Sequence, residues 1–174
     1  MPTGRTRLLK LREEAQDRLQ KEAKKHPIIR RLATAPGLGR IRAAQVVAIV
    51  VTPDRFRTKR QFWSYCGLGI VMRTSADWVR EGGRWVRAPV AQTRGLTRKR
   101  NPVLKSVFKG AALTVTQMAD HPLKQAYDRL LEAGTKPNLA KVTIARRIAA
   151  IVLAMWKNEE DYNPAKQELA PRTP

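Results

Sequence analysis

Apolar residues recur at helical spacing along two long stretches, and this pattern constrains the fold more than any other feature. Residues 102–115 form the first stretch, which follows Asn101 and Pro102, a pair typical of an N-cap and a first helical position. Residues 138–156 form the second, with Asn138 as the expected N-cap. Spacings of three and four residues bury one side of a helix. The sequence therefore predicts a mainly α fold.

Five shorter helices are expected around these two. They cover residues 5–25, a short segment starting at Pro27, about Gly39 to Val50, residues 58–66, and the segment that Asp120 caps and Gly134 ends. Thr58 and Gln61 are spaced as a capping box for the fourth of them. The first helix has a narrow apolar stripe like a coiled-coil seam, although it lasts only about two to three heptads. The residues of the stripe are Leu8, Leu11, Ala15, Leu19 and Ala23.

The pattern changes in residues 68–90. β-forming residues surround a Glu-Gly-Gly turn at 81–83, which predicts one basic β-hairpin, and we expect no other sheet. The chain length suits one domain with an appendage. We place the domain at residues 27–157, after a coiled-coil-like connector helix at 1–26. A polar tail at 158–174 is expected to fray.

The chain is strongly basic. Its 174 residues include 35 Lys and Arg against 14 Asp and Glu, which gives a formal charge of +21. Hydrophobic residues make up 43%, so the charge decorates a folded surface. Such an excess predicts a polyanionic partner, of which nucleic acid is the commonest. A basic RNA-binding scaffold of ribosomal type fits the charge equally well.

Several classes of protein are disfavoured. No apolar run approaches the roughly 20 residues of a membrane-spanning helix, and the N-terminus lacks the core of a secretory signal. We therefore expect a cytoplasmic protein without a membrane partner, associated with the nucleoid when it acts. One cysteine, Cys66, and two histidines, His26 and His121, exclude a four-ligand Cys/His zinc site. The acidic residues are scattered, so we expect neither a metal-dependent nuclease nor a bound cofactor from this chain alone.

A glycine-rich turn precedes the helix at Gly39. In the segment PGLGRIRAA, Gly37 and Gly39 let the backbone turn tightly, and the N–H groups at a helix start can bind phosphate. Arg40 and Arg42 follow where a second phosphate contact would form. The segment has the form of a helix-hairpin-helix element. The alternative is a turn that only joins two packed helices.

The hairpin and the segment after it form a second candidate nucleic-acid surface. Basic residues accumulate there, namely Arg73, Arg80, Arg84, Arg87, Arg94, Arg98, Lys99 and Arg100. Trp78 and Trp85 lie among them and can stack on splayed bases while the cations follow the backbone. They can equally anchor the hairpin on the helices. For Trp63 and Trp156 we favour packing in the core.

A candidate nucleophile lies in the same segment. The chain contains three serines, namely Ser64, Ser75 and Ser106. Ser64 and Ser106 are expected within helices, where they are poorly presented. Ser75 lies beside Arg73, and arginines can neutralise a phosphate before a hydroxyl attacks it. Thr74 is an adjacent competitor, and Asp77 could orient a hydroxyl or pair with an arginine.

The order of these blocks resembles a known family. PGLGRIRAA is followed by FRTKRQFWSYCGL, the basic hairpin, GLTRKRNPVLKSVFKGAA and KVTIARRIAAIVLAMW. Over about residues 28–156, this series resembles the C-terminal transposase domain of the IS-one-ten (IS116/IS902-type) family of insertion-sequence transposases. The helix that precedes it would correspond to the coiled-coil connector of that family.

The resemblance implies a function in DNA strand cleavage and exchange. The family's serine nucleophile falls on Ser75 by its position after the GL block. The resemblance further implies a RuvC-like domain with acidic ligands, through which alone Mg²⁺ would enter, and a structured guide RNA, a DNA partner and a homo-oligomer. This sequence departs from the family where Ala76 follows the serine, since glycine is common there.

Two functions therefore remain open. The carboxylate set of a RuvC-like domain is not found in this sequence, so we expect the chain to bind nucleic acid and to need that domain, in cis or in trans, for transposition. The competing hypothesis is a non-enzymatic nucleic-acid-binding module that uses the turn and the basic hairpin only as contacts.

Overall fold

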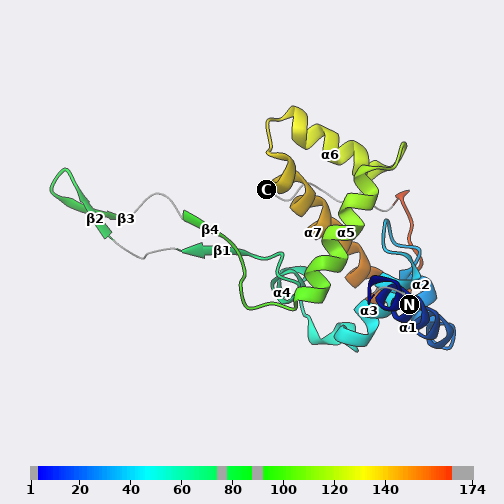
Figure 1. Cartoon of the computed structure of the whole chain (residues 1–174). Helices are drawn as coiled ribbons and strands as arrows, with labels where there is room; N and C mark the ends of the chain where they lie inside the picture. The colour runs from blue at the N-terminus through cyan, green and yellow to red at the C-terminus, as the bar shows by residue number, and fades with distance from the viewer. Residues whose placement is uncertain (1–3, 74–77, 88–91, 166–174) are drawn as a thin grey trace.

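A computed structural model describes residues 4–73, 78–87 and 92–165 of the chain. Seven α-helices, one 3-10 helix and four short strands occur within these residues (Figure 1). In chain order they are α1 (Gly4–Ala23), α2 (Pro27–Leu32), α3 (Gly39–Val50), η1 (Pro53–Arg55), α4 (Lys59–Tyr65), β1 (Ile70–Arg73), β2 (Trp78–Glu81), β3 (Arg84–Arg87), β4 (Gln92–Leu96), α5 (Pro102–Thr116), α6 (Pro122–Glu132) and α7 (Pro137–Asn158). The predicted mainly α fold is confirmed.

Two of the predicted helix starts are confirmed in detail. Thr58 Oγ1 accepts a hydrogen bond from the backbone N–H of Gln61, and Gln61 Oε1 accepts one from the backbone N–H of Thr58. This reciprocal pair is the predicted capping box of α4. At the start of α5, Asn101 Oδ1 accepts from the backbone N–H groups of Val103 and Leu104. Each cap satisfies donors that the first turn of a helix leaves free.

Two other predicted caps are wrong. α6 is capped by His121, whose Nδ1 accepts a hydrogen bond from the backbone N–H of Leu123 at 3.1 Å, and not by Asp120. α7 begins at Pro137, so Asn138 lies inside its first turn. The reason is the same in both helices: proline takes the first helical position, which makes the residue before it the N-cap.

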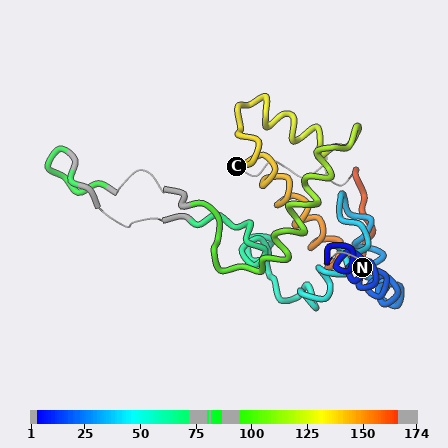
Figure 2. Tube along the Cα trace, viewed as in Figure 1, coloured from blue at the N-terminus to red at the C-terminus, as the bar shows by residue number. Residues whose placement is uncertain are grey.

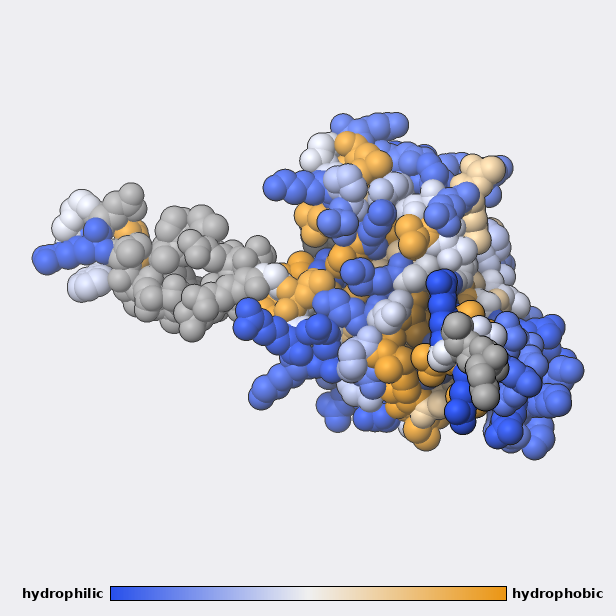
Figure 3. All heavy atoms as spheres, in the orientation of Figure 1, coloured by the Kyte–Doolittle hydropathy of each residue, from blue (hydrophilic) through white to orange (hydrophobic). Residues whose placement is uncertain are grey.

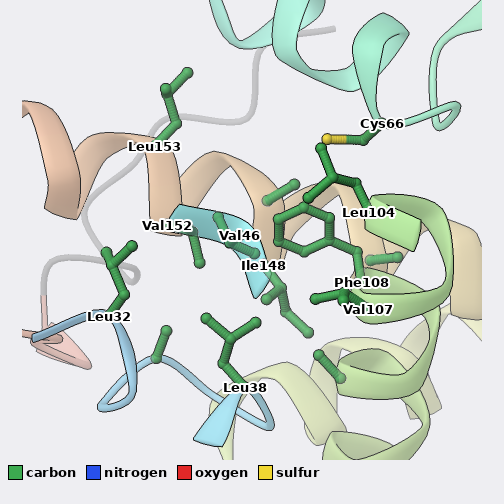
Figure 4. Close-up of a cluster of buried hydrophobic side chains, with 14 of the residues drawn as sticks. Leu32, Leu38, Val46, Cys66, Leu104, Val107, Phe108, Ile148, Val152 and Leu153 are labelled. Atoms are coloured by element: carbon green, nitrogen blue, oxygen red, sulfur yellow. The ribbon is translucent and has the colours of Figure 1, made fainter. Parts of the chain in front are cut away.

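α7 forms the centre of the helical body, where it packs against α2, α4, α5, α6 and η1. Its buried residues join those of α3, α4 and α5 in one apolar core (Figure 4). Phe108 of α5 and Phe62 of α4 meet edge to face in this core, with ring centroids 5.7 Å apart. Burying a side chain of this kind stabilises a fold by roughly 1.5–3 kcal/mol. The core thus provides a packed platform for the segments on its surface.

An antiparallel arm leaves this body between α4 and α5 (Figure 1, Figure 2). β1 pairs with β4 near the body, and β2 pairs with β3 at the far end. The β2–β3 hairpin confirms the predicted one, whereas the expectation of no other strand pair is wrong. The ladder of β1 with β4 is irregular between Ile70 and Met72, and β4 contains Gly95 at a φ of 84°. Such an irregularity interrupts the alternation that would have revealed the pair.

α1 packs on α3 at one end only. Ala23 is buried and Leu19 is partly buried, as the apolar stripe predicts. At the other end of the helix, Leu8 and Leu11 are 69% and 52% exposed. The apolar stripe therefore continues past the part of α1 that the body covers.

After α7 the chain turns back over the body. The backbone N–H of Tyr162 donates a hydrogen bond to Thr34 Oγ1 at 3.1 Å. Arg31 lies 3.7 Å from a carboxylate oxygen of Glu159 and 3.8 Å from one of Asp161. The described part of the polar tail thus makes contacts that its composition did not lead us to expect.

Candidate nucleic-acid interface

The β2–β3 hairpin presents basic and aromatic residues away from the helical body. Its turn contains Gly82 and Gly83 at φ values of 58° and 82°, as a tight two-residue hairpin turn requires. Arg80 and Arg84 are exposed. Trp85 is 64% exposed. Of the two alternatives open for Trp85, packing against the helices is therefore wrong.

Trp156 and Trp63 pack as predicted. Trp156 is buried near the end of α7, and Trp63 Nε1 donates a hydrogen bond to the carbonyl oxygen of Arg146 at 2.9 Å. Arg146 Nε donates to the carbonyl oxygen of Leu68 at 2.6 Å. These two bonds tie α4 and the start of the arm to α7. Sequence reasoning missed Arg146, and no local signal marks it, because its partners lie 83 and 78 residues away in the chain.

Three cations lie close together around the first half of α5, namely Arg100, Lys105 and Lys109. The side chain of Arg100 covers Gly67 so closely that a Cβ on this glycine would collide with it. Burial, together with the charges of Arg100 and Lys109, lowers the pKa of Lys105. Where the structure describes the chain, no carboxylate forms an ion pair with any of the three. Sequence reasoning missed Lys105 and Lys109, although a spacing of four places them on one face of a predicted helix.

The PGLG turn at residues 36–39 packs against α5. Gly37 has a φ of 68°, and a Cβ there would collide with the carbonyl oxygen of Ala111. Arg42 Nη1 donates hydrogen bonds to the carbonyl oxygen of Gly37 at 2.6 Å and to Thr114 Oγ1 at 3.1 Å. Arg42 therefore holds the turn onto α5.

A groove of about 750 Å³ opens between α1 and the start of α3. Arg12, Arg40 and Arg42 line it, together with Gly39 at the first residue of α3. Its other lining residues carry no carboxylate, and they are Ala15, Gln16, Leu19, Gln20, Leu38, Ile41 and Gln45. The structure thus brings three predicted residues together with Arg12, which sequence reasoning missed. The groove suits an anion by its charge.

The predicted nucleophile and its neighbours are not placed. Ser75, Thr74 and Asp77 lie outside the described residues. The other two serines, Ser64 in α4 and Ser106 in α5, are exposed. Both lie within helices, as predicted, and any test of a serine nucleophile must include them.

Other kinds of site are not found in the described parts of the chain. No three His, Cys, Asp or Glu side chains there come together in a group that could hold a metal ion. The thiol of Cys66 is buried, which raises its pKa and keeps it protonated. Among the described helices, none has the length and apolar character needed to cross a membrane.

The charges of the chain are unevenly distributed. Residues 55–119 contain 14 Lys and Arg but only two acidic residues, Asp77 and Glu81. The predicted cations of this segment follow the arm: Arg73, Arg87 and Arg94 lie in β1, β3 and β4, and Arg98, Lys99 and Arg100 are exposed between β4 and α5. Hydrophilic side chains gather where the arm joins the body (Figure 3). The exposed cations of the arm that the structure describes thus lie at its tip, as Arg80 and Arg84, and at its base, as Arg98, Lys99 and Arg100.

Comparison with known proteins agrees with these features. The sequence profile of the transposase IS116/IS110/IS902 family matches residues 29–128, more than half of the chain. The chain belongs to this family. The matched residues contain both the PGLG turn and the basic arm, so the resemblance drawn from the ordered blocks is confirmed. A search of curated protein sequences found no match. A transposase acts on DNA, which makes DNA the partner of this protein.

Proposed function

We propose that this transposase domain binds DNA along its basic arm and PGLG turn and supplies Ser75 as the nucleophile of strand cleavage and exchange. The observation that carries the proposal is the set of exposed cations along the arm and α5, for which no ion pair is found among the side chains that the structure describes. α5 links the arm with the PGLG turn, since Lys109 precedes Gly110 and the guanidinium of Arg42 lies against that glycine. Each phosphate that such cations neutralise releases condensed counterions.

The proposed chemical step is a phosphoryl transfer to serine. The Ser75 oxygen bonds to the phosphorus of a DNA phosphodiester, one bridging P–O bond breaks, and a deoxyribose hydroxyl leaves with the proton. Arg73, two residues before this serine, together with Arg80 and Arg84 would neutralise the charge that develops on the phosphate oxygens. The phosphate remains esterified, now to the serine, so that the hydroxyl of a new DNA end can attack it and rejoin the strand.

The proposal includes partners that this step needs. A RuvC-like domain, in cis or in trans, would hold Mg²⁺ with its own carboxylates, and the residues assigned here take no part in metal binding. A structured guide RNA would share the basic surface with DNA. The exposed Leu8 and Leu11 support a homo-oligomer, because an apolar stripe on a helix is buried when two helices pair.

The experiment that tests the proposal looks for the covalent intermediate. The chain is mixed with a RuvC-like partner domain, guide RNA and end-labelled cognate DNA, and protein–DNA adducts are separated on a denaturing gel. We expect an adduct with the native chain and none with Ser75→Ala, which should keep its affinity for DNA. Ser64→Ala and Ser106→Ala are matched controls that should retain the adduct.

Other outcomes lead to different conclusions. An adduct that survives Ser75→Ala but disappears in Thr74→Ala would assign the nucleophile to the neighbouring threonine. DNA binding without an adduct under every condition would favour the second candidate, a non-enzymatic nucleic-acid-binding module. That candidate draws on the same basic surface and on the groove beside the PGLG turn.

A further inference from the structure

The tip of the arm carries an aromatic ring that does not pack on the helices. Trp85 lies in β3 and is 64% exposed, and the hairpin that holds it projects from the helical body (Figure 1, Figure 3). Large aromatic rings contribute to folding chiefly through burial, and tryptophan is enriched where proteins bind partners. The position of Trp85 therefore suits contact with another molecule.

The register of the hairpin places a cation beside this ring. Arg80 of β2 is the cross-strand partner of Trp85. Directly opposed residues of an antiparallel pair lie on the same face. The pair Trp78 and Arg87, two positions along the same ladder, repeats this combination of residue types. Trp85 and the exposed Arg80 therefore lie on the same face of the hairpin.

The charge around Trp85 identifies the chemistry of the partner. Arg80, the cross-strand partner of Trp85, is exposed, and the one acidic residue of the two strands, Glu81, is the cross-strand partner of Arg84 instead. A partner that docks by apolar contact would need a continuous apolar patch, whereas Trp85 and the 39% exposed Val86 are adjacent in a strand and lie on opposite faces. A flat ring among cations instead matches nucleic acid, whose bases offer flat faces beside charged phosphates.

We propose that Trp85 stacks on an unpaired base of the bound strand while Arg80 contacts a flanking phosphate. The base must be unpaired, because neighbouring bases cover both faces of a base inside a duplex. This inference rests on the proposed DNA-binding function and narrows it. The preferred substrate at the tip of the arm is a locally opened strand, which strand exchange necessarily produces.

The test compares two oligonucleotides of equal charge. Affinity is measured by fluorescence anisotropy for a labelled single-stranded thymidine 12-mer and for a 12-mer of abasic sugar-phosphate units at the same salt concentration. We expect the native chain to prefer the thymidine strand. Trp85→Ala should lose about 5- to 150-fold in affinity for it, the range expected when one stacking contact is removed, and keep its affinity for the abasic strand.

Matched variants separate stacking from other effects. Trp85→Tyr keeps an aromatic face and should retain most of the preference, whereas Trp85→Leu keeps only bulk and should lose it. Val86→Ala, on the opposite face of the same strand, should behave like the native chain. Arg80→Ala should weaken binding to both oligonucleotides, because it removes a phosphate contact and not a stacking partner.

Failure of the inference and failure of the proposed function give different results. If the native chain binds both oligonucleotides equally, or if Trp85→Ala matches the native chain on both, stacking is wrong while DNA binding stands. If Trp85→Ala weakens both strands equally, the tryptophan only supports the hairpin, and the inference is again wrong. If the native chain binds neither oligonucleotide, nor duplex DNA, the proposed function fails together with the inference.

Discussion

Gly37 and Gly39 have the same left-handed backbone but different surroundings, and this difference can be measured. Their φ values are 68° and 63°, and a Cβ on Gly37 would collide with the carbonyl oxygen of Ala111, whereas one on Gly39 would meet open space. Gly39→Ala should therefore lose only the left-handed conformational term, about 1–2 kcal/mol. Gly37→Ala should lose more than about 2 kcal/mol, because the turn must also move off α5. Urea unfolding of both variants measures the difference.

The two glycines also show the limit of sequence reasoning at the scale of a residue. The segment PGLG predicts both as turn residues, and both are, but the collision at Gly37 depends on α5, far along the chain. Equal losses of stability in the two variants would contradict the tight contact. The structural role of Arg42 was missed for the same reason. The sequence suggests a phosphate contact, and the structure also shows hydrogen bonds from Arg42 to Gly37 and to the distant Thr114.

The N-cap of α6 makes the stability of this element depend on pH. His121 Nδ1 accepts the hydrogen bond from Leu123, so only the neutral ring can act as the cap. Burial lowers the pKa of His121, and Asp120 partly opposes this. In the unfolded chain histidine binds its proton near about pH 6.5, so the capped state is favoured above that pH and loses stability as pH falls toward the lower folded pKa.

His121→Asn isolates this effect, because asparagine caps a helix without titrating. Between pH 7.5 and 5, the free energy of unfolding of the native chain should fall by up to about 1–2 kcal/mol more than that of the variant. Urea unfolding at a series of pH values measures both. The exposed His26 is common to the two proteins. If the free energy of unfolding falls equally with pH in the native chain and in His121→Asn, His121 does not act as a titrating N-cap.

Whole helices were easier to predict than their starts or the arm. The apolar stripes of α5 and α7 are strong because both helices cross the core. The spacing of their apolar residues can be recognised in the sequence even when the elements that pack on them are not known. The caps of α6 and α7 were misplaced because polar caps were chosen ahead of the proline rule. The pairing of β1 with β4 was missed because an irregular ladder shows no clean alternation, so only the hairpin between them could be found.

At the scale of the molecule, composition predicted a polyanion partner but could not say which face binds it. The described ion pairs lie away from the arm, at Lys25, Arg31 and Lys124, where carboxylates of α1, α6 and the tail are close. The cations along the arm and α5 form no such ion pair with any side chain that the structure describes. This asymmetry arises from folding, because it depends on which distant acidic residues come near each cation.

The salt dependence of DNA affinity distinguishes the effect of the cations along the arm and α5 from the effect of the total charge of the chain. Lys105→Gln with Lys109→Gln removes two cations of the α5 cluster, whereas Lys25→Gln with Lys124→Gln removes two cations that are already paired with carboxylates. Both double variants change the formal charge by the same amount. In duplex DNA each phosphate contact contributes about 0.9 to the slope of log affinity against log salt concentration, so the first variant should lower the slope by up to about 1.8 and the second should leave it unchanged. Equal changes would mean that total charge, and not the face formed by the arm and α5, controls DNA binding.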